Sequence, residues 1–321
     1  MPIISAGCSE PQKLLRKALP PTIDSTTMSH QTSQQDLPAT IYTPGSPLQN
    51  PLKLVSEIFS DLWRTRELAW MLFLRDLKAA YRQTYLGYIW ILLPALATTA
   101  VWYYMTNQKL ITVSETPIPY PAFVMLGQIV WATFTASFQA PQIGFNSGSP
   151  VFMKLKVPPE AFIANACAKV VFDLLVKTLL IITIFAIYWS ELTISWTIAL
   201  APLGFLITML FGVSLGLLMV PIGSLYKDVE RVVTMALPFL MYTTPVIFPL
   251  AQGDGLAATL MQWNPLSPLI EVTRSWLAQG SADPALLLGF LILVPVSLVI
   301  ALIGAVILRV AMPHLVVRMG M

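Results

Sequence analysis

Three charged residues stand at helical spacing inside a strongly apolar part of the sequence. Lys169, Asp173 and Lys177 follow one another at intervals of four residues, so a helix places them in one column on one face. Charges within a membrane helix are costly, and they normally face the protein interior or a water-filled cavity and pair with one another. The column predicts either a structural ion pair with lysines that reach toward the surface, or a polar part of a transport path.

A basic segment precedes the first long apolar stretch. Arg75, Lys78 and Arg82 stand close together, with Tyr81 between the last two. Basic residues beside a membrane attract anionic lipid head groups, each contributing about 1 kcal/mol. The same side chains suit a pyrophosphate on a lipid-linked substrate. We predict a site for lipid head groups or for substrate entrance here, with membrane anchoring as the leading interpretation.

The sequence shows no other cluster of catalytic type. It contains no Gly-Lys pair, so a P-loop of the form GxxxxGK[ST] is absent from it and this kind of ATP site is excluded. The two cysteines and two histidines are each isolated, which predicts no metal site. The nearest acidic pair, Asp228 and Glu230, stands between Lys227 and Arg231 and is interpreted as a salt-bridged turn.

These residues must be positioned by membrane helices. The chain is 56% hydrophobic and 11% charged, whereas soluble domains carry about 25% charged residues. Long stretches lack any Asp, Glu, Lys or Arg, and each accommodates a helix of about 20 apolar residues, enough to cross a bilayer. The fold class predicted is an all-α membrane protein with six transmembrane helices, over residues 88–105, 120–140, 162–189, 196–221, 232–250 and 284–308.

The remaining segments have distinct patterns. Residues 1–50 are rich in Pro, Ser, Thr and Gln, which predicts a disordered cytoplasmic tail before a transmembrane domain over 51–321. Residues 51–63 form an amphipathic pattern, typical of a helix in the membrane surface or of a soluble helix packed on a partner. Gly and Pro residues predict a loop with a short helix over 142–159. Two Pro-broken apolar runs over 255–281 predict re-entrant helices between spans five and six.

The distribution of basic residues predicts the orientation. Fifteen Lys and Arg residues flank the predicted spans on one side, whereas only Lys109 and Arg274 flank them on the other. Positive residues are enriched on the cytoplasmic side of membrane proteins, so both termini are predicted to be cytoplasmic. Since the basic residues gather beside the spans, the net charge of +3 predicts contact with membrane lipids and no nucleic acid partner.

Five segments then resemble a known family in their order along the chain. They are RDLK followed by YRQTYLGYIW (75–90), KLKVPPE (154–160), YKDVER (226–231), TPVIFP (244–249) and NPLSPLIEVTR (264–274). This set resembles the permeases that export O-antigen, capsular polysaccharide and teichoic acid, the membrane subunits of two-component ABC exporters. The resemblance runs from about residue 52 to the C-terminus. Lys227 and Thr244 replace the usual Arg and Ser, which keeps the charge and the hydroxyl.

The resemblance implies partners and roles for several residues. It implies a second copy of the chain and two copies of an ABC ATPase subunit, which binds ATP and Mg²⁺, so no cofactor is expected in this chain. The loop after span two would couple to the ATPase, although a basic loop that only enforces topology explains it nearly as well. The residues implied are Lys154, Lys156, Pro158 and Glu160 for coupling, and Asn264, Pro265, Glu271 and Arg274 for an external gate.

Aromatic residues concentrate in spans one, two and five. Rings near span ends usually mark the membrane interface. In a polysaccharide channel, flat rings also contact sugars with their faces while N–H and O–H groups bind hydroxyls. The candidates for lining the channel are Trp90, Trp102, Tyr103, Tyr104, Trp131, Phe134, Phe138 and Tyr242.

The leading functional prediction is the transmembrane subunit of an ABC exporter in the bacterial inner membrane. Its predicted substrate is a lipid-linked polysaccharide, with O-antigen as the leading candidate. A separate subunit is expected to hydrolyse the ATP, so the chain itself is predicted not to be an enzyme. One alternative is an ABC exporter of a small hydrophobic compound. The other is a membrane-embedded glycan transferase, which would need a catalytic base or metal-binding acids at one membrane surface.

Overall fold

The computed structural model describes residues 51–82, 85, 87–111, 113–152, 154, 157–193, 195–250 and 255–319. The chain divides into two units, Met1–Gly45 and Ser46–Met321, and the described residues all belong to the second. The predicted disordered tail over residues 1–50 lies outside the described residues and stays a prediction.

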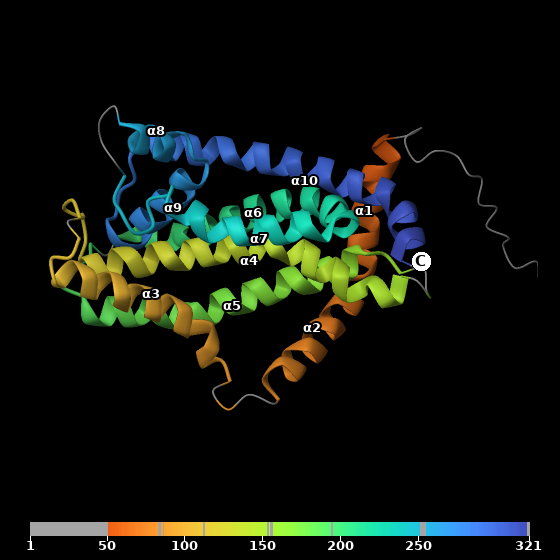
Figure 1. Cartoon of the computed structure of the whole chain (residues 1–321), viewed down its shortest axis with the longest axis horizontal. Helices are drawn as coiled ribbons and strands as arrows, with labels where there is room; N and C mark the ends of the chain where they lie inside the picture. Colours follow the sequence, from red (N-terminus) through yellow and green to blue (C-terminus); the bar gives the residue numbers. More distant parts are fainter. Residues whose placement is uncertain are drawn as a thin grey trace, which may run out of the picture. The chain divides into compact units, whose positions relative to one another are not determined.

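The described residues are helical and contain no strand, which confirms the all-α class (Figure 1). The helices are α1 (Pro51–Arg64), α2 (Arg66–Tyr81), α3 (Ile89–Asn107), α4 (Tyr120–Phe152), α5 (Glu160–Ile187), η2 (Trp196–Leu200), α6 (Ala201–Leu225), α7 (Lys227–Met241), α8 (Leu256–Trp263), α9 (Leu266–Ala278) and α10 (Pro284–Met319).

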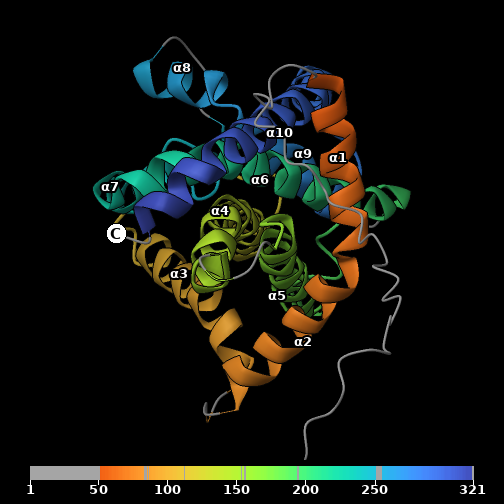
Figure 2. The ribbon, with the colours of Figure 1, turned by 90° about the vertical axis from the view of Figure 1, so that its right-hand side faces the viewer.

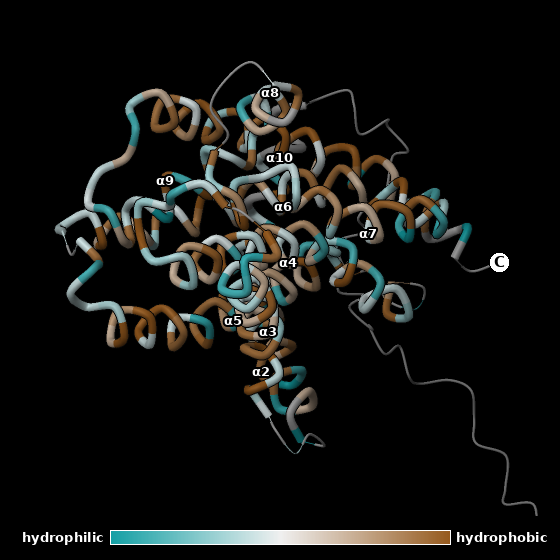
Figure 3. Tube along the Cα trace, turned by 60° about the vertical axis from the view of Figure 1, so that its left-hand side comes forward, coloured by the Kyte–Doolittle hydropathy of each residue, from teal (hydrophilic) through white to brown (hydrophobic). Residues whose placement is uncertain are grey.

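Among the described residues, five helices are long and apolar enough to cross a membrane. They are Ile89–Asn107, Tyr120–Phe152, Glu160–Ile187, Trp196–Leu225 and Pro284–Leu315. Apolar side chains remain exposed along α5 and α10, and Figure 3 shows apolar residues predominating on α10. Lipid is the solvent that such surfaces require. The chain is a multi-pass membrane protein.

The predicted fifth span is shorter as a helix than the sequence indicated. The helix predicted over 232–250 ends at Met241, so that α7 has 15 residues, and turns follow it. Its first turn carries the charged residues from Lys227 to Arg231, which leaves a short apolar run, and Pro245 prevents the helix from continuing. The six-span count therefore stays a prediction.

The loop predicted over residues 142–159 is mostly wrong, because α4 continues as helix to Phe152. Gly144 and Gly148, which suggested a loop, serve close packing. A Cβ atom at Gly144 would lie 2.6 Å from the carbonyl oxygen of Phe162, and one at Gly148 would lie 2.8 Å from the Phe162 ring. The two glycines therefore let α4 approach the start of α5, and the true connection is short.

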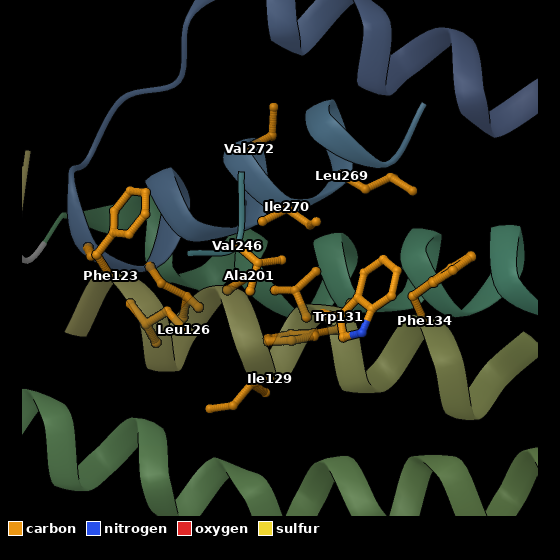
Figure 4. Close-up of a cluster of buried hydrophobic side chains, with 14 of the residues drawn as sticks. Phe123, Leu126, Ile129, Trp131, Phe134, Ala201, Val246, Leu269, Ile270 and Val272 are labelled. Carbon is orange, nitrogen blue, oxygen red and sulfur yellow. The ribbon is translucent and has the colours of Figure 1, made fainter. Parts of the chain in front are cut away.

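Helix α4 is the centre of the helical bundle. It packs against α5 and α6, with α3 on a further side, and α10 packs on α6 (Figure 2). Figure 4 shows the main core, where Trp131 and Phe134 of α4 meet residues of α6 and α9 and the segment that follows α7. The rings of Phe134 and Phe211 lie 6.0 Å apart between α4 and α6. This core includes Val246 and Ile247 and thereby holds the start of the segment that follows α7.

Candidate functional site

A fully buried arginine joins α9 to the segment after α7. The side chain of Arg274 has no exposed surface. Its Nη1 donates to the carbonyl oxygen of Pro245 at 2.8 Å, and its Nη2 pairs with Glu271. Its Cζ lies 3.5 Å from the centre of the Phe123 ring, a cation–π contact. The predicted pair between Glu271 and Arg274 is thus present, and it extends to α4.

Asn264 holds the same segment from the other end. Its Nδ2 donates to the carbonyl oxygen of Thr243 at 3.2 Å and to the Thr243 hydroxyl at 3.0 Å, while its Oδ1 accepts from the Leu266 backbone at 3.0 Å. Pro265 follows it and is exposed. Non-helical backbone in apolar surroundings needs such partners. The four predicted gate residues therefore lie around one break in the helices, and their role as a gate stays a prediction.

A second polar cluster lies where α2 packs on α5. The Asp76 carboxylate accepts from Lys169 at 2.7 Å, from Asn165 at 3.0 Å and from Arg75 at 2.8 Å. Burial opposes the charge on Asp76, but the hydrogen bonds from Lys169, Asn165 and Arg75 together outweigh it and lower the pKa of Asp76 to about 2. The sequence predicted a site only for the basic neighbours of Asp76. It gave no signal for Asp76 itself, because its partners Asn165 and Lys169 lie 89 and 93 residues away along the chain.

This cluster replaces the pairing expected along α5. Lys169 pairs with Asp76 of another helix, and among the described residues no ion pair within 4.0 Å joins Asp173 to Lys169 or Lys177. Lys177 is buried and Asp173 half-buried. The column of charges is present on α5 as predicted, but its strongest contact runs between helices.

Replacing Asp76 by asparagine is expected to lower the free energy of unfolding by about 1 to 2 kcal/mol at neutral pH. The three donors from Lys169, Asn165 and Arg75 lose their charged acceptor, and the NH2 group of the new amide cannot accept a hydrogen bond. The folded pKa of about 2 lies below the unfolded value of about 3.9. The stabilisation is therefore complete above about pH 4 and lost as the pH falls toward 2. Thermal unfolding of both proteins at several pH values measures it. Asp228→Asn, on an exposed carboxylate, is the control and should change little.

The predicted site for lipid head groups remains partly free on α2. Lys78 and Arg82 are exposed, whereas Arg75 forms an ion pair with Asp76. The side chain of Tyr81 lies outside the described residues. The exposed bases stay available for anionic groups, and their role stays a prediction.

The predicted coupling residues divide into two kinds. Lys154 is exposed and Pro158 half-buried, whereas Lys156 lies outside the described residues. Glu160 begins α5, and its Oε1 lies 3.2 Å from Nη2 of Arg309. Glu160 is therefore held within the chain, so the exposed Lys154 is the better candidate for contact with an ATPase.

Arg309 gathers three carboxylates from two other helices. Its Nη2 pairs with Asp61 of α1 and with Glu160 of α5, and its Nη1 lies 3.7 Å from Glu57 of α1. The group ties α1 and the start of α5 to the end of α10. The sequence carried two signals of this cluster, namely the i, i+4 spacing of Glu57 and Asp61 and the single charge that ends the last apolar stretch.

The aromatic residues fall into buried and exposed groups. Trp131 and Phe134 are 5% and 3% exposed and belong to the core, so within this chain they pack helices together rather than line a path. Trp102 is partly buried and lies 6.4 Å from the ring of Tyr242. The remaining candidates for lining a channel are the exposed rings of Trp90, Tyr103, Tyr104 and Tyr242 and the half-buried rings of Trp102 and Phe138.

Comparison with known proteins gives these features a family context. Residues 67–277 match the family described as ABC-2 type transporter. The chain is 24% identical over 218 residues to the O-antigen export system permease protein RfbA of Myxococcus xanthus, covering 65% of this chain and 80% of that protein. It is 23% identical to RfbA of Klebsiella pneumoniae over 213 residues, covering 65% and 79%.

The chain is also similar to a transport protein for another polysaccharide, polysialic acid. The chain is 20% identical over 235 residues to the polysialic acid transport protein KpsM of Escherichia coli, covering 68% of this chain and 84% of that protein. The family match includes α2 to α9 almost completely, and with it the clusters around Asp76 and Arg274. The chain is a member of the ABC-2 type transporter family.

Proposed function

We propose that this chain is the permease subunit of an ABC exporter that moves a lipid-linked polysaccharide across the bacterial inner membrane. O-antigen is the leading candidate for this polysaccharide. One observation carries the proposal. The relatives described above are export or transport proteins for O-antigen and polysialic acid, and the match covers 79% to 84% of their lengths. A match of that extent includes most of each permease.

The architecture supports this function. Two copies of the chain would enclose a channel, with the exposed rings of α3 offering flat faces to sugars. Both termini would be cytoplasmic, α7 with the segment after it would complete a sixth span, and α8 and α9 would re-enter the membrane from the outer side. Since the sequence has no P-loop, two separate ATPase subunits would bind ATP and Mg²⁺ and contact the chain around Lys154.

Deleting the gene is expected to abolish the surface polysaccharide and to accumulate its lipid-linked form inside the cell. Electrophoresis of surface glycan and extraction of intracellular lipid-linked polymer measure the two pools. Expression of the chain from a plasmid should restore the surface pool. Unchanged surface polymer in the deletion strain would overturn the proposal.

A further inference from the structure

A crevice with polar and apolar walls lies along the C-terminal part of α4, from Phe138 to Ser149. It consists of two adjoining cavities of about 190 and 680 Å³, which share Gly223 and Glu230. Its walls come from α4, α6 and α7, and the larger cavity also touches α10. The residues that line the crevice include none that the sequence predicted for coupling, gating or lipid contact. Phe138, which was predicted to line the channel, lies in the wall of the smaller cavity.

One face of α4 lines both cavities with uncharged polar side chains. Gln139, Gln142, Asn146 and Ser149 follow at intervals of three, four and three residues, so they form a stripe of about 15 Å along the helix. Polar side chains on membrane helices normally face the protein interior or a water-filled space. These side chains share one face because α4 continues as helix to Phe152, where the sequence predicted a loop.

Gln142 fixes the geometry of this stripe. It is 8% exposed, and its Nε2 donates to Asn146 Oδ1 at 3.1 Å and to Ser224 Oγ at 3.4 Å. Its Oε1 has no hydrogen-bond partner among the described residues. A Cβ atom at Gly223 would lie 2.9 Å from Oε1, so glycine there makes room for the amide. The Gln142 amide is therefore held in place, with its Oε1 buried beside Gly223.

The opposite wall carries an acidic side chain, Glu230, which lines the larger cavity together with the basic side chains of Lys227 and Arg318. Among the described residues, Glu230 makes no ion pair within 4.0 Å, whereas its neighbour Asp228 lies 3.6 Å from Arg231 and outside the crevice. The sequence therefore grouped two carboxylates that the structure separates. Glu230 and Thr234, one turn apart on α7, offer acceptors and a hydroxyl toward the cavity shared with Gln142.

We infer that this crevice binds sugar residues of the exported glycan as they enter the channel, an inference that rests on the proposed function. Amides that donate and accept, hydroxyls and one carboxylate match the hydroxyls of a sugar ring, and Phe138 offers an apolar face to the ring. In the smaller cavity, Glu230 is the one charged residue of the described lining, and it repels a phosphate there. In the larger cavity, Lys227 and Arg318 stand beside Glu230 and give the lining a net positive charge.

Cysteine labelling tests occupancy directly. Asn146→Cys and, as a matched control, Ser147→Cys on the exposed neighbouring position are made in the full chain carrying Cys8→Ser and Cys167→Ala. Inverted membrane vesicles are treated with a maleimide after glycan synthesis has been either active or blocked. The Asn146→Cys variant should lose most of its labelling when synthesis is active, and the Ser147→Cys variant should not. Equal labelling of the Asn146→Cys variant in both conditions would overturn the inference.

A pair of substitutions on α7 tests the contribution to export. Glu230→Gln is expected to lower the rate at which glycan appears on the surface about tenfold, at an unchanged amount of the chain in the membrane. The reason is that a sugar hydroxyl bound in the crevice loses its charged acceptor. Asp228→Asn is the matched control and should export like the wild type.

Two outcomes would overturn the sugar assignment while leaving the proposed function intact. One is normal export by both variants in a strain where deletion of the gene abolishes surface glycan. The other is faster export by Glu230→Gln together with slower export by Lys227→Gln and Arg318→Gln, which would identify a phosphate as the bound group. If deletion leaves surface glycan unchanged, the proposed function itself fails.

Discussion

Replacing Arg274 by methionine is expected to lower the free energy of unfolding by about 3 to 5 kcal/mol, because removing one partner of a buried pair leaves an uncompensated charge. Glu271 would lose its counter-ion, and the carbonyl oxygen of Pro245 would lose its donor. The Phe123 ring would also lose the guanidinium that lies over it. Thermal unfolding of the detergent-solubilised chain, followed by tryptophan fluorescence, measures the loss.

A second variant separates the lost charge pair from lost packing. Adding Glu271→Gln to Arg274→Met should restore part of the stability, because it removes the carboxylate that was left unpaired. An unfolding temperature for Arg274→Met equal to that of the wild type would contradict the structural role given to Arg274. It would mean that another group satisfies the Pro245 carbonyl.

Replacing Arg309 by glutamine is expected to release α1 from the bundle and to cost about 2 to 3 kcal/mol, since three carboxylates lose one shared cation and the group is partly screened by solvent. Asp61 and Glu160 would then repel each other between α1 and α5. Limited trypsin digestion should cut faster at Arg64, the last residue of α1. Unfolding temperature gives the second readout.

The control for this prediction is an exposed pair on α7. Arg231→Gln breaks the contact with Asp228, and it should change the unfolding free energy by less than about 1 kcal/mol. Adding Glu160→Gln to Arg309→Gln should slow the cleavage again, because one of the three negative charges is removed. Cleavage at Arg64 that is equally slow in Arg309→Gln and in the wild type would contradict the role of Arg309.

Whether a helix could be predicted from the sequence depends on whether it is exposed or packed on several sides. Helix α10 has no charged residue from Pro284 to Leu308 and keeps many apolar side chains exposed, so missing charges were a sufficient signal. Helix α4 is packed on several sides, and its glycines are contact points rather than breaks. Helix α7 starts with charges and ends before Pro245, so its apolar run overstated its length.

The polar clusters show the same division between local and distant contacts. The pair of Glu271 and Arg274 spans three residues of one helix and was visible from spacing alone. Lys169 and Asp76 are separated by 93 residues, and Arg309 and Asp61 by 248. Such contacts depend on which helices pack together, which one sequence does not contain. The spacing therefore predicted the position of Lys169 on one face of α5 correctly, but its ion-pair partner is Asp76 of α2 and not Asp173.

The most direct test of the central claim is transport in inverted inner-membrane vesicles. Vesicles that contain the chain, its ATPase subunits and radiolabelled lipid-linked polysaccharide are supplied with ATP, and polymer protected inside the vesicles is measured. If the chain is the permease, protection of the polymer requires both ATP and this chain. Equal protection in vesicles that lack the chain, or in vesicles without ATP, would contradict it.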